Sequence, residues 1–115
     1  MNLTEKCIKI AKENGANLVG IASVENYKFD PSSEKHPRFY MKNAQAVIVM
    51  GLKLVDALWD NLRGKQDVHS MNLYNYLIHY NYDLLDYIAI QTARFLEEEG
   101  YDAYPVQAIA EKRNG

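Results

Sequence analysis

Three side chains that could bind a ligand lie within five positions of one another, at His36, Arg38 and Tyr40. A ring that titrates near neutral pH, a permanent cation and an aromatic face are groups that hold a charged or flat cofactor. All three fall in a long connection, residues 25–43, that contains prolines and serines and shows no sustained hydrophobic period. We therefore treat them as candidate cofactor-binding residues, with the alternative that Arg38 pairs with a surface carboxylate.

The other reactive side chains form no recognisable catalytic or metal-binding pattern. His36, His69 and His79 are 33 and 10 positions apart, and none is close in sequence to the single cysteine, Cys7. One thiol cannot form an internal disulfide, a multi-cysteine zinc site or an iron–sulfur cluster held by four thiolates. We predict no catalytic residue and no metal ligand in this chain alone, and we expect His79 to be partly buried beside tyrosines.

Tyrosine is concentrated in one segment, because five of the nine tyrosines lie between residues 74 and 87. At helical spacing Tyr80 and Tyr87 fall near the apolar stripe, whereas Tyr74, Tyr76 and Tyr82 spread around the helix. Tyrosine is enriched at protein interfaces. We therefore predict Tyr74, Tyr76 and Tyr82 as candidate interface residues, with core packing as the alternative for part of the cluster.

Hydrophobic periodicity predicts the first elements that position these residues. An apolar stripe predicts a helix at about residues 3–14, with Asn2 as its N-cap and Gly15 as its left-handed end. Short runs rich in apolar and β-branched residues predict strands at 18–24 and 46–54. The second strand lacks polar alternation, which is typical of a strand buried on both faces.

A long helix and a last strand are predicted in the second half of the chain. Apolar spacing of three, four and seven predicts a helix over about 71–99, with Ser70 as its N-cap and Gly100 as its stop. Residues 102–109 predict a third strand, placed at an edge or an end by Pro105. Because a strand–helix–strand unit is a right-handed crossover, its two strands are expected to be parallel.

The fold class predicted from these elements is α/β. We expect a small, mostly parallel or mixed sheet of about three to four strands, packed by helices, with one long helix before the last strand. A further short helix is predicted at about residues 55–62, between the second strand and the long helix.

Composition limits the classes of function. The chain has 115 residues, of which 48% are hydrophobic and 24% are charged, as expected for one folded domain. Its net charge of −2 argues against direct nucleic-acid binding. The longest apolar run, residues 46–52, is far shorter than the roughly 20 residues that span a membrane, and no secretory signal is recognisable. We expect a cytoplasmic protein with no membrane partner and a reduced thiol at Cys7.

A series of short motifs occurs in order along nearly the whole chain. The motifs are GANLVGIA at 15–22, HPR at 36–38, AQAVIVMGL at 44–52, YN at 80–81, LL at 84–85, FLE at 95–97 and GYDAYPV at 100–106. The ordered series resembles the N-terminal segment of the epoxyqueuosine reductase-like family, whose members are corrinoid- and iron–sulfur-dependent reductases. Residues 41–44 stand where that family usually has a Pro-Gly-Ala turn, so a looser iron–sulfur relative is an equal alternative.

The resemblance implies a role for the chain as part of a larger protein. In the family, the catalytic acid and two cysteine clusters follow this segment, and the full-length proteins use cobalamin and iron–sulfur clusters to remove the epoxide oxygen of a queuosine precursor in tRNA. The resemblance therefore implies that residues 1–115 are a single scaffold domain that carries no catalytic residue and binds no cofactor alone. Its partner would be the remainder of the parent polypeptide.

A second hypothesis belongs to a different class of function. The chain could be a free-standing binding or assembly module that dimerises, or holds another partner, through its tyrosine-rich helix. Its partner would then be a self-associating copy or another protein, and the protein would not be an enzyme.

Overall fold

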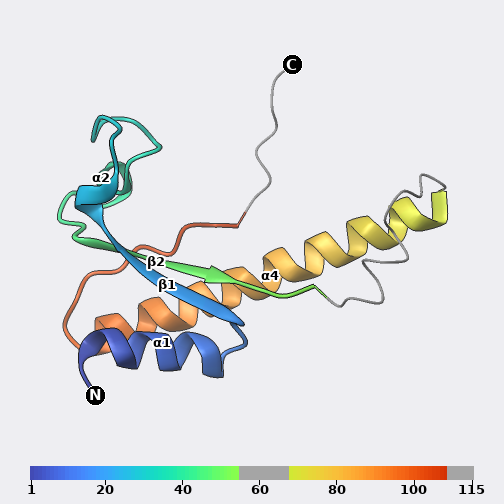
Figure 1. The fold of residues 1–115 in the computed structure, drawn as a ribbon, viewed down its shortest axis with the longest axis horizontal. Helices are drawn as coiled ribbons and strands as arrows, with labels where there is room; N and C mark the ends of the chain where they lie inside the picture. The colour runs from blue at the N-terminus through green and yellow to red at the C-terminus, as the bar shows by residue number, and fades with distance from the viewer. Residues whose placement is uncertain (55–67, 109–115) are drawn as a thin grey trace.

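The computed structural model describes residues 1–54 and 68–108. In Figure 1 a pair of strands crosses the long helix α4, and the shorter helix α1 lies below the strands in this view. The elements are α1 (Leu3–Glu13), β1 (Leu18–Ser23), the 3-10 helix η1 (Val24–Asn26), α2 (Pro37–Tyr40), β2 (Ala46–Gly51) and α4 (Val68–Glu98). The positions of the two predicted long helices and of the first two strands agree with these bounds to within a few residues.

The start of α1 is set by its N-cap. The side chain of Asn2 accepts a hydrogen bond from the backbone N–H of Glu5 at 2.8 Å, as the sequence predicts. This bond satisfies one of the N–H groups that the first turn of a helix leaves without a partner. Cys7 and Ala11 form the buried side of α1, and the remaining face is charged.

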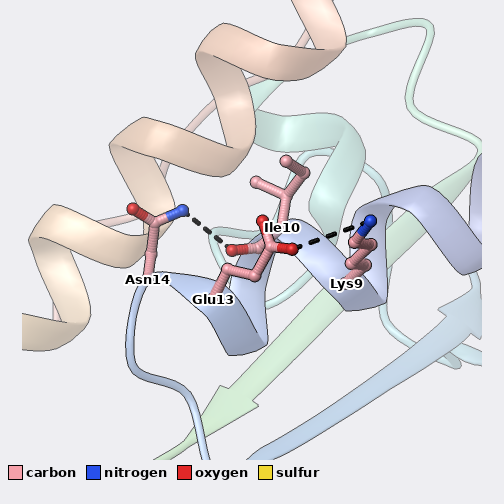
Figure 2. A network of polar contacts seen from close by, with 4 residues as sticks. All are labelled: Lys9, Ile10, Glu13 and Asn14. Atoms are coloured by element: carbon pink, nitrogen blue, oxygen red, sulfur yellow. Dashed lines mark hydrogen bonds and ion pairs between the residues drawn. The ribbon is translucent and has the colours of Figure 1, made fainter.

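The end of α1 is held by polar contacts that Figure 2 shows from close by. The side-chain amide of Asn14 donates to the carbonyl oxygen of Ile10 at 2.8 Å, and Lys9 pairs with Glu13 at 3.8 Å. The ion pair is exposed and therefore contributes little to stability. Gly15 follows with a φ of +121°, a conformation that a residue with a side chain rarely adopts.

The two strands pair antiparallel, with a register that runs from Leu18 opposite Gly51 to Ser23 opposite Ala46. Paired residues in an antiparallel ladder point to the same face. Val19 and Met50 are such a pair, and both pack towards the helices. On the opposite face the side chains of Leu18 and Val49 are exposed, so the sheet has one covered and one uncovered apolar face.

The predicted sheet of three to four mostly parallel strands is wrong. The described residues contain one sheet of two antiparallel strands. Residues 102–108, the described part of the third strand predicted at 102–109, form no strand. Pro105 has no N–H to donate to a ladder. The N–H of Ala108 is also unavailable to a neighbouring strand, because it donates to the carboxylate of Asp86 on α4 at 2.7 Å.

Two further predictions concern the limits of the long helix. α4 already begins at Val68, so Ser70 lies inside its first turn and is not its N-cap. The predicted stop at Gly100 agrees with the end of α4 at Glu98, and Gly100 has a φ of +92°. The short helix predicted at 55–62 lies outside the described residues.

The core lies where α1, α4 and the sheet meet. Ile88 of α4 and Ala11 of α1 are fully buried, and Ala16 in the turn after α1 is nearly so. The half-buried side chains packed against them are Val19, Met50, Leu52 and Leu84. Because Ala11 and Ala16 are small, the backbone around α1 can approach α4 closely at this point.

Among the residues that the structure describes, no helix is both long enough and apolar enough to cross a lipid bilayer.

Because Ile88 lies at the centre of the core, truncating its side chain should destabilise the protein strongly. Replacing it (Ile88→Ala) should lower the free energy of unfolding by about 2–5 kcal/mol, because the lost methyl groups leave a cavity where the layers meet. Urea denaturation at low micromolar protein concentration measures the change. Ile90→Ala, two positions along the same helix but about half exposed, is the matched control and should cost less than about 1 kcal/mol. Equal losses would contradict this account of the core.

Candidate functional site

The loop that leads to the candidate residues is folded by short-range hydrogen bonds. The Asp30 carboxylate accepts from the backbone N–H of Ser32 at 2.9 Å and from its hydroxyl at 2.7 Å. These two bonds, the backbone bond first, lower the pKa of Asp30 below its ordinary value. The carbonyl oxygen of Ser33 accepts a hydrogen bond from the backbone N–H of His36 at 2.9 Å. This turn places His36 directly before α2.

His36 is the N-cap of α2 and is almost completely buried, with 6% of its surface exposed. Its Nδ1 accepts a hydrogen bond from the backbone N–H of Arg38 at 3.1 Å. In a neutral imidazole the other nitrogen then carries the proton, so Nε2 is a donor. Nε2 makes no hydrogen bond with another described residue, and the ring lies edge-on to Tyr27 with 6.1 Å between centroids.

The other two candidate residues of this loop lie in different surroundings. Arg38 donates from Nε to the carbonyl oxygen of Ala44 at 3.2 Å, and this bond ties the end of the loop to the strand that follows. Arg38 therefore braces the loop and does not line the cavity described next. Tyr40 does line it, and its ring lies 5.3 Å from the ring of Tyr104, measured between centroids.

A cavity of about 440 Å³ lies between β2, the C-terminal half of α4 and residues 102–106. Its apolar walls come from Ile48 and Met50 of β2 and from Ala89, Ala93 and Leu96 of α4. The loop at 34–41 supplies its polar side, including His36 and Tyr40. The volume falls within the range typical of small-molecule sites, which are mostly apolar with a few placed polar groups.

Sequence analysis found two of the four aromatic rings of this cavity, counting the imidazole of His36. His36 and Tyr40 were expected to act together, and both line it. Tyr27 and Tyr104 also line it and were missed. Tyr27 precedes His36 by nine residues in the same connection, and this proximity could have identified Tyr27 as a lining residue. Tyr104 was assigned to the predicted third strand and was therefore not considered as a lining residue.

A second cavity of about 320 Å³ lies beside α1 and includes the thiol-bearing residue Cys7 together with Ile21 and Tyr101. Burial, and to a lesser extent the negative charge of Glu99, raises the pKa of the Cys7 thiol above its ordinary value. A thiol with a raised pKa stays protonated near neutral pH and is a weak nucleophile. Cys7 is thus an inert core group.

The tyrosine-rich part of α4 is largely open to solvent. Of the three candidate interface residues, Tyr74 and Tyr76 are exposed and Tyr82 is half-buried. Tyr80 and Tyr87, which the sequence places near the buried stripe, are both more than half exposed. The predicted burial of His79 is also wrong, because His79 is exposed.

Within residues 1–54 and 68–108, no group of three or more His, Cys, Asp or Glu side chains is arranged to hold a metal ion. No family model matches the chain, and no curated protein or solved structure is significantly similar to it. The site has to be interpreted from its own geometry.

The raised pKa of Cys7 predicts a specific loss of stability at high pH. Below pH 9.0, the ordinary value, the thiol is protonated in both states and has no effect on the equilibrium. As the pH rises from 9.0 towards the higher folded-state pKa, the unfolded chain loses its proton more easily, so stability falls. Urea denaturation between pH 7 and 10.5 should therefore show a steeper decline for the wild type than for Cys7→Ala, in which nothing titrates at this position. Parallel declines would show that the thiol is not buried as described.

Proposed function

We propose that this chain is a scaffold domain that forms one wall of a cofactor cavity in an iron–sulfur- and cobalamin-dependent reductase resembling the epoxyqueuosine reductase-like family. The catalytic and cluster-binding regions would belong to further polypeptide. The observation that carries the proposal is the apolar cavity over α4 and β2, whose lining residues Tyr104 and Val106 remain more than half exposed. A cavity with exposed walls is one that additional chain or a large ligand can complete.

The residues of the cavity fit one edge of a corrinoid, since a volume of about 440 Å³ holds only part of so large a molecule. A corrin ring is broad and flat over its face and carries carboxamide groups at its edge. The rings of Tyr40 and Tyr104, 5.3 Å apart, offer flat surfaces, and the Nε2–H of His36 is an unused donor for a carboxamide oxygen. When bound, cobalamin would supply the reductive chemistry, and these residues would orient its edge and exclude water from it.

The same residues do not fit an iron–sulfur cluster. A cluster is normally held by about four cysteine thiolates, and Cys7 is the single cysteine of the chain. Cys7 lines the second cavity beside α1 and not the one that contains His36. A cluster would therefore have to be held by cysteines other than Cys7.

Weak binding of added corrinoid tests the proposal. One wall of the cavity holds no resident cofactor by itself, but it should still contact free corrinoid at high micromolar concentration. Methylcobalamin is mixed with the protein, and sedimentation velocity is followed both at corrin and at protein absorbance. The wild type should carry corrin absorbance with the protein boundary. Tyr40→Ala and Tyr104→Ala should each weaken binding by roughly tenfold, because each removes one of the paired aromatic faces.

Tyr74→Ala is the matched control, because Tyr74 is exposed on the same protein but lines neither cavity. It should bind methylcobalamin as the wild type does. Corrin absorbance that never moves with the protein at about 100 μM would rule the proposal out, as would equal losses in all three variants.

A further inference from the structure

The outer face of α4 carries a regular seam of large side chains. Tyr76, Tyr80, Asp83, Tyr87, Ile90 and Arg94 follow one another at intervals of four, three, four, three and four residues. This alternation keeps side chains on one face of a helix and is the spacing of a coiled-coil seam. We call these six residues the outer seam.

The outer seam is uncovered in the monomer. The exposed fractions are 69% for Tyr76, 57% for Tyr80, 51% for Tyr87 and 49% for Ile90. Four large side chains in a row on a solvent-facing helix are unusual for a monomeric surface, where charged residues normally occupy such positions. Figure 1 shows that the N-terminal half of α4, drawn in yellow, also extends past α1 and the sheet.

The charged members of the outer seam are placed asymmetrically. Asp83 lies towards its N-terminal end and Arg94 at its C-terminal end, and neither forms an ion pair with another described residue. Arg94 donates only to the side-chain oxygen of Gln91 at 3.2 Å, and Gln91 donates to the hydroxyl of Tyr87 at 3.3 Å. The seam is therefore positive at one end and negative towards the other.

We propose that the outer seam is a homodimer interface in which two copies of α4 pack antiparallel. When the second copy is turned end for end about an axis between residues 88 and 89, Tyr87 of one copy faces Ile90 of the other. The same rotation places Asp83 opposite Arg94, twice, because the arrangement is twofold symmetric. A parallel pairing in register would instead place Asp83 against Asp83 and Arg94 against Arg94.

The outer seam is complementary to an antiparallel copy of itself. The partner that fits it is therefore a second copy of the chain. A different partner would need a seam of opposite polarity, whereas a second copy supplies it by symmetry. Tyr80, Tyr87 and Ile90 have residues of the second α4 opposite them and bury on the order of 100 Å² apiece, so two copies bury roughly 600 Å² of apolar surface, to which the charged pairs add. Tyr76 would face position 101, beyond the end of α4. An interface of this size lies at the small end of specific interfaces, so we expect a weak dimer that forms on the order of 10–100 μM.

The dimer does not depend on the proposed cofactor cavity. Ala89, Thr92 and Ala93 of α4 line that cavity and lie on a different side of the helix from Tyr87 and Ile90. Both functions can therefore coexist, and the failure of one leaves the other untouched.

Reciprocal charge reversal tests the proposal. Sedimentation equilibrium from about 5 to 500 μM should show the 13.2 kDa chain converting to twice that mass. Asp83→Arg and Arg94→Asp should each weaken dimerisation by roughly tenfold or more, since each faces like charges twice across the antiparallel interface. An equimolar mixture of the two variants should dimerise nearly as well as the wild type, because one copy then presents two arginines to two aspartates.

A matched mixture controls for net charge. Glu25→Lys changes the charge as much as Asp83→Arg does, but Glu25 lies in η1, away from α4. It should dimerise with itself as the wild type does. Mixed with Arg94→Asp, it should leave the Arg94→Asp chains largely monomeric, because a mixed dimer would set one Asp83–Arg94 pair against one pair of aspartates. A wild type that remains monomeric at about 500 μM, single reversals without effect, or equal incorporation of the Arg94→Asp chains into dimers in both mixtures would each overturn the proposal.

Discussion

The close approach of three segments at Ile88 is the constraint on which the rest of the fold depends. Ala11 and Ala16 meet Ile88 with side chains of one carbon, so that α1 and its following turn lie directly against α4. Gly15 sits between them for a conformational reason and not for space. A Cβ at Gly15 would lie an ordinary 3.7 Å from Ile88, but its φ of +121° is one that side-chain-bearing residues avoid.

Because Ile88 fixes the orientation of α4, each side of the helix faces a different environment. Ile88 faces the core, Ala89 and Ala93 face the large cavity, and Tyr87 and Ile90 face solvent. Neighbouring positions of one helix thus serve three surfaces, because each residue turns the side chain by about 100°. When a helix carries large residues on its outer face as well as its inner face, the sequence alone does not separate the two faces. Tyr80 and Tyr87 therefore fall near the apolar stripe in sequence and yet are exposed.

The helices α1 and α4 could be predicted because their signals are local. The cap at Asn2, the glycine at 15 and the apolar spacing of α1 and α4 all act within a few residues of the backbone they determine. The number and direction of strands depend on contacts between distant segments, which spacing alone does not encode. The site shows the same division: His36 and Tyr40 are neighbours in sequence and were found together, whereas Tyr104 reaches the cavity only through the path of the chain after α4.

The missing third strand and the large cavity have a single cause. A third strand beside β2 would have brought the backbone of residues 102–108 within hydrogen-bonding distance of that edge, about 4.8 Å away, and would have left no room between them. Pro105 cannot donate to such a ladder, and the N–H of Ala108 is directed to Asp86 on α4. The segment therefore stands off from the sheet, held at Tyr104 by the ring of Tyr40, and the space it leaves against Ile48 and Met50 is the cavity itself. The segment that fails to form the predicted third strand is thus the segment that forms one wall of the cavity.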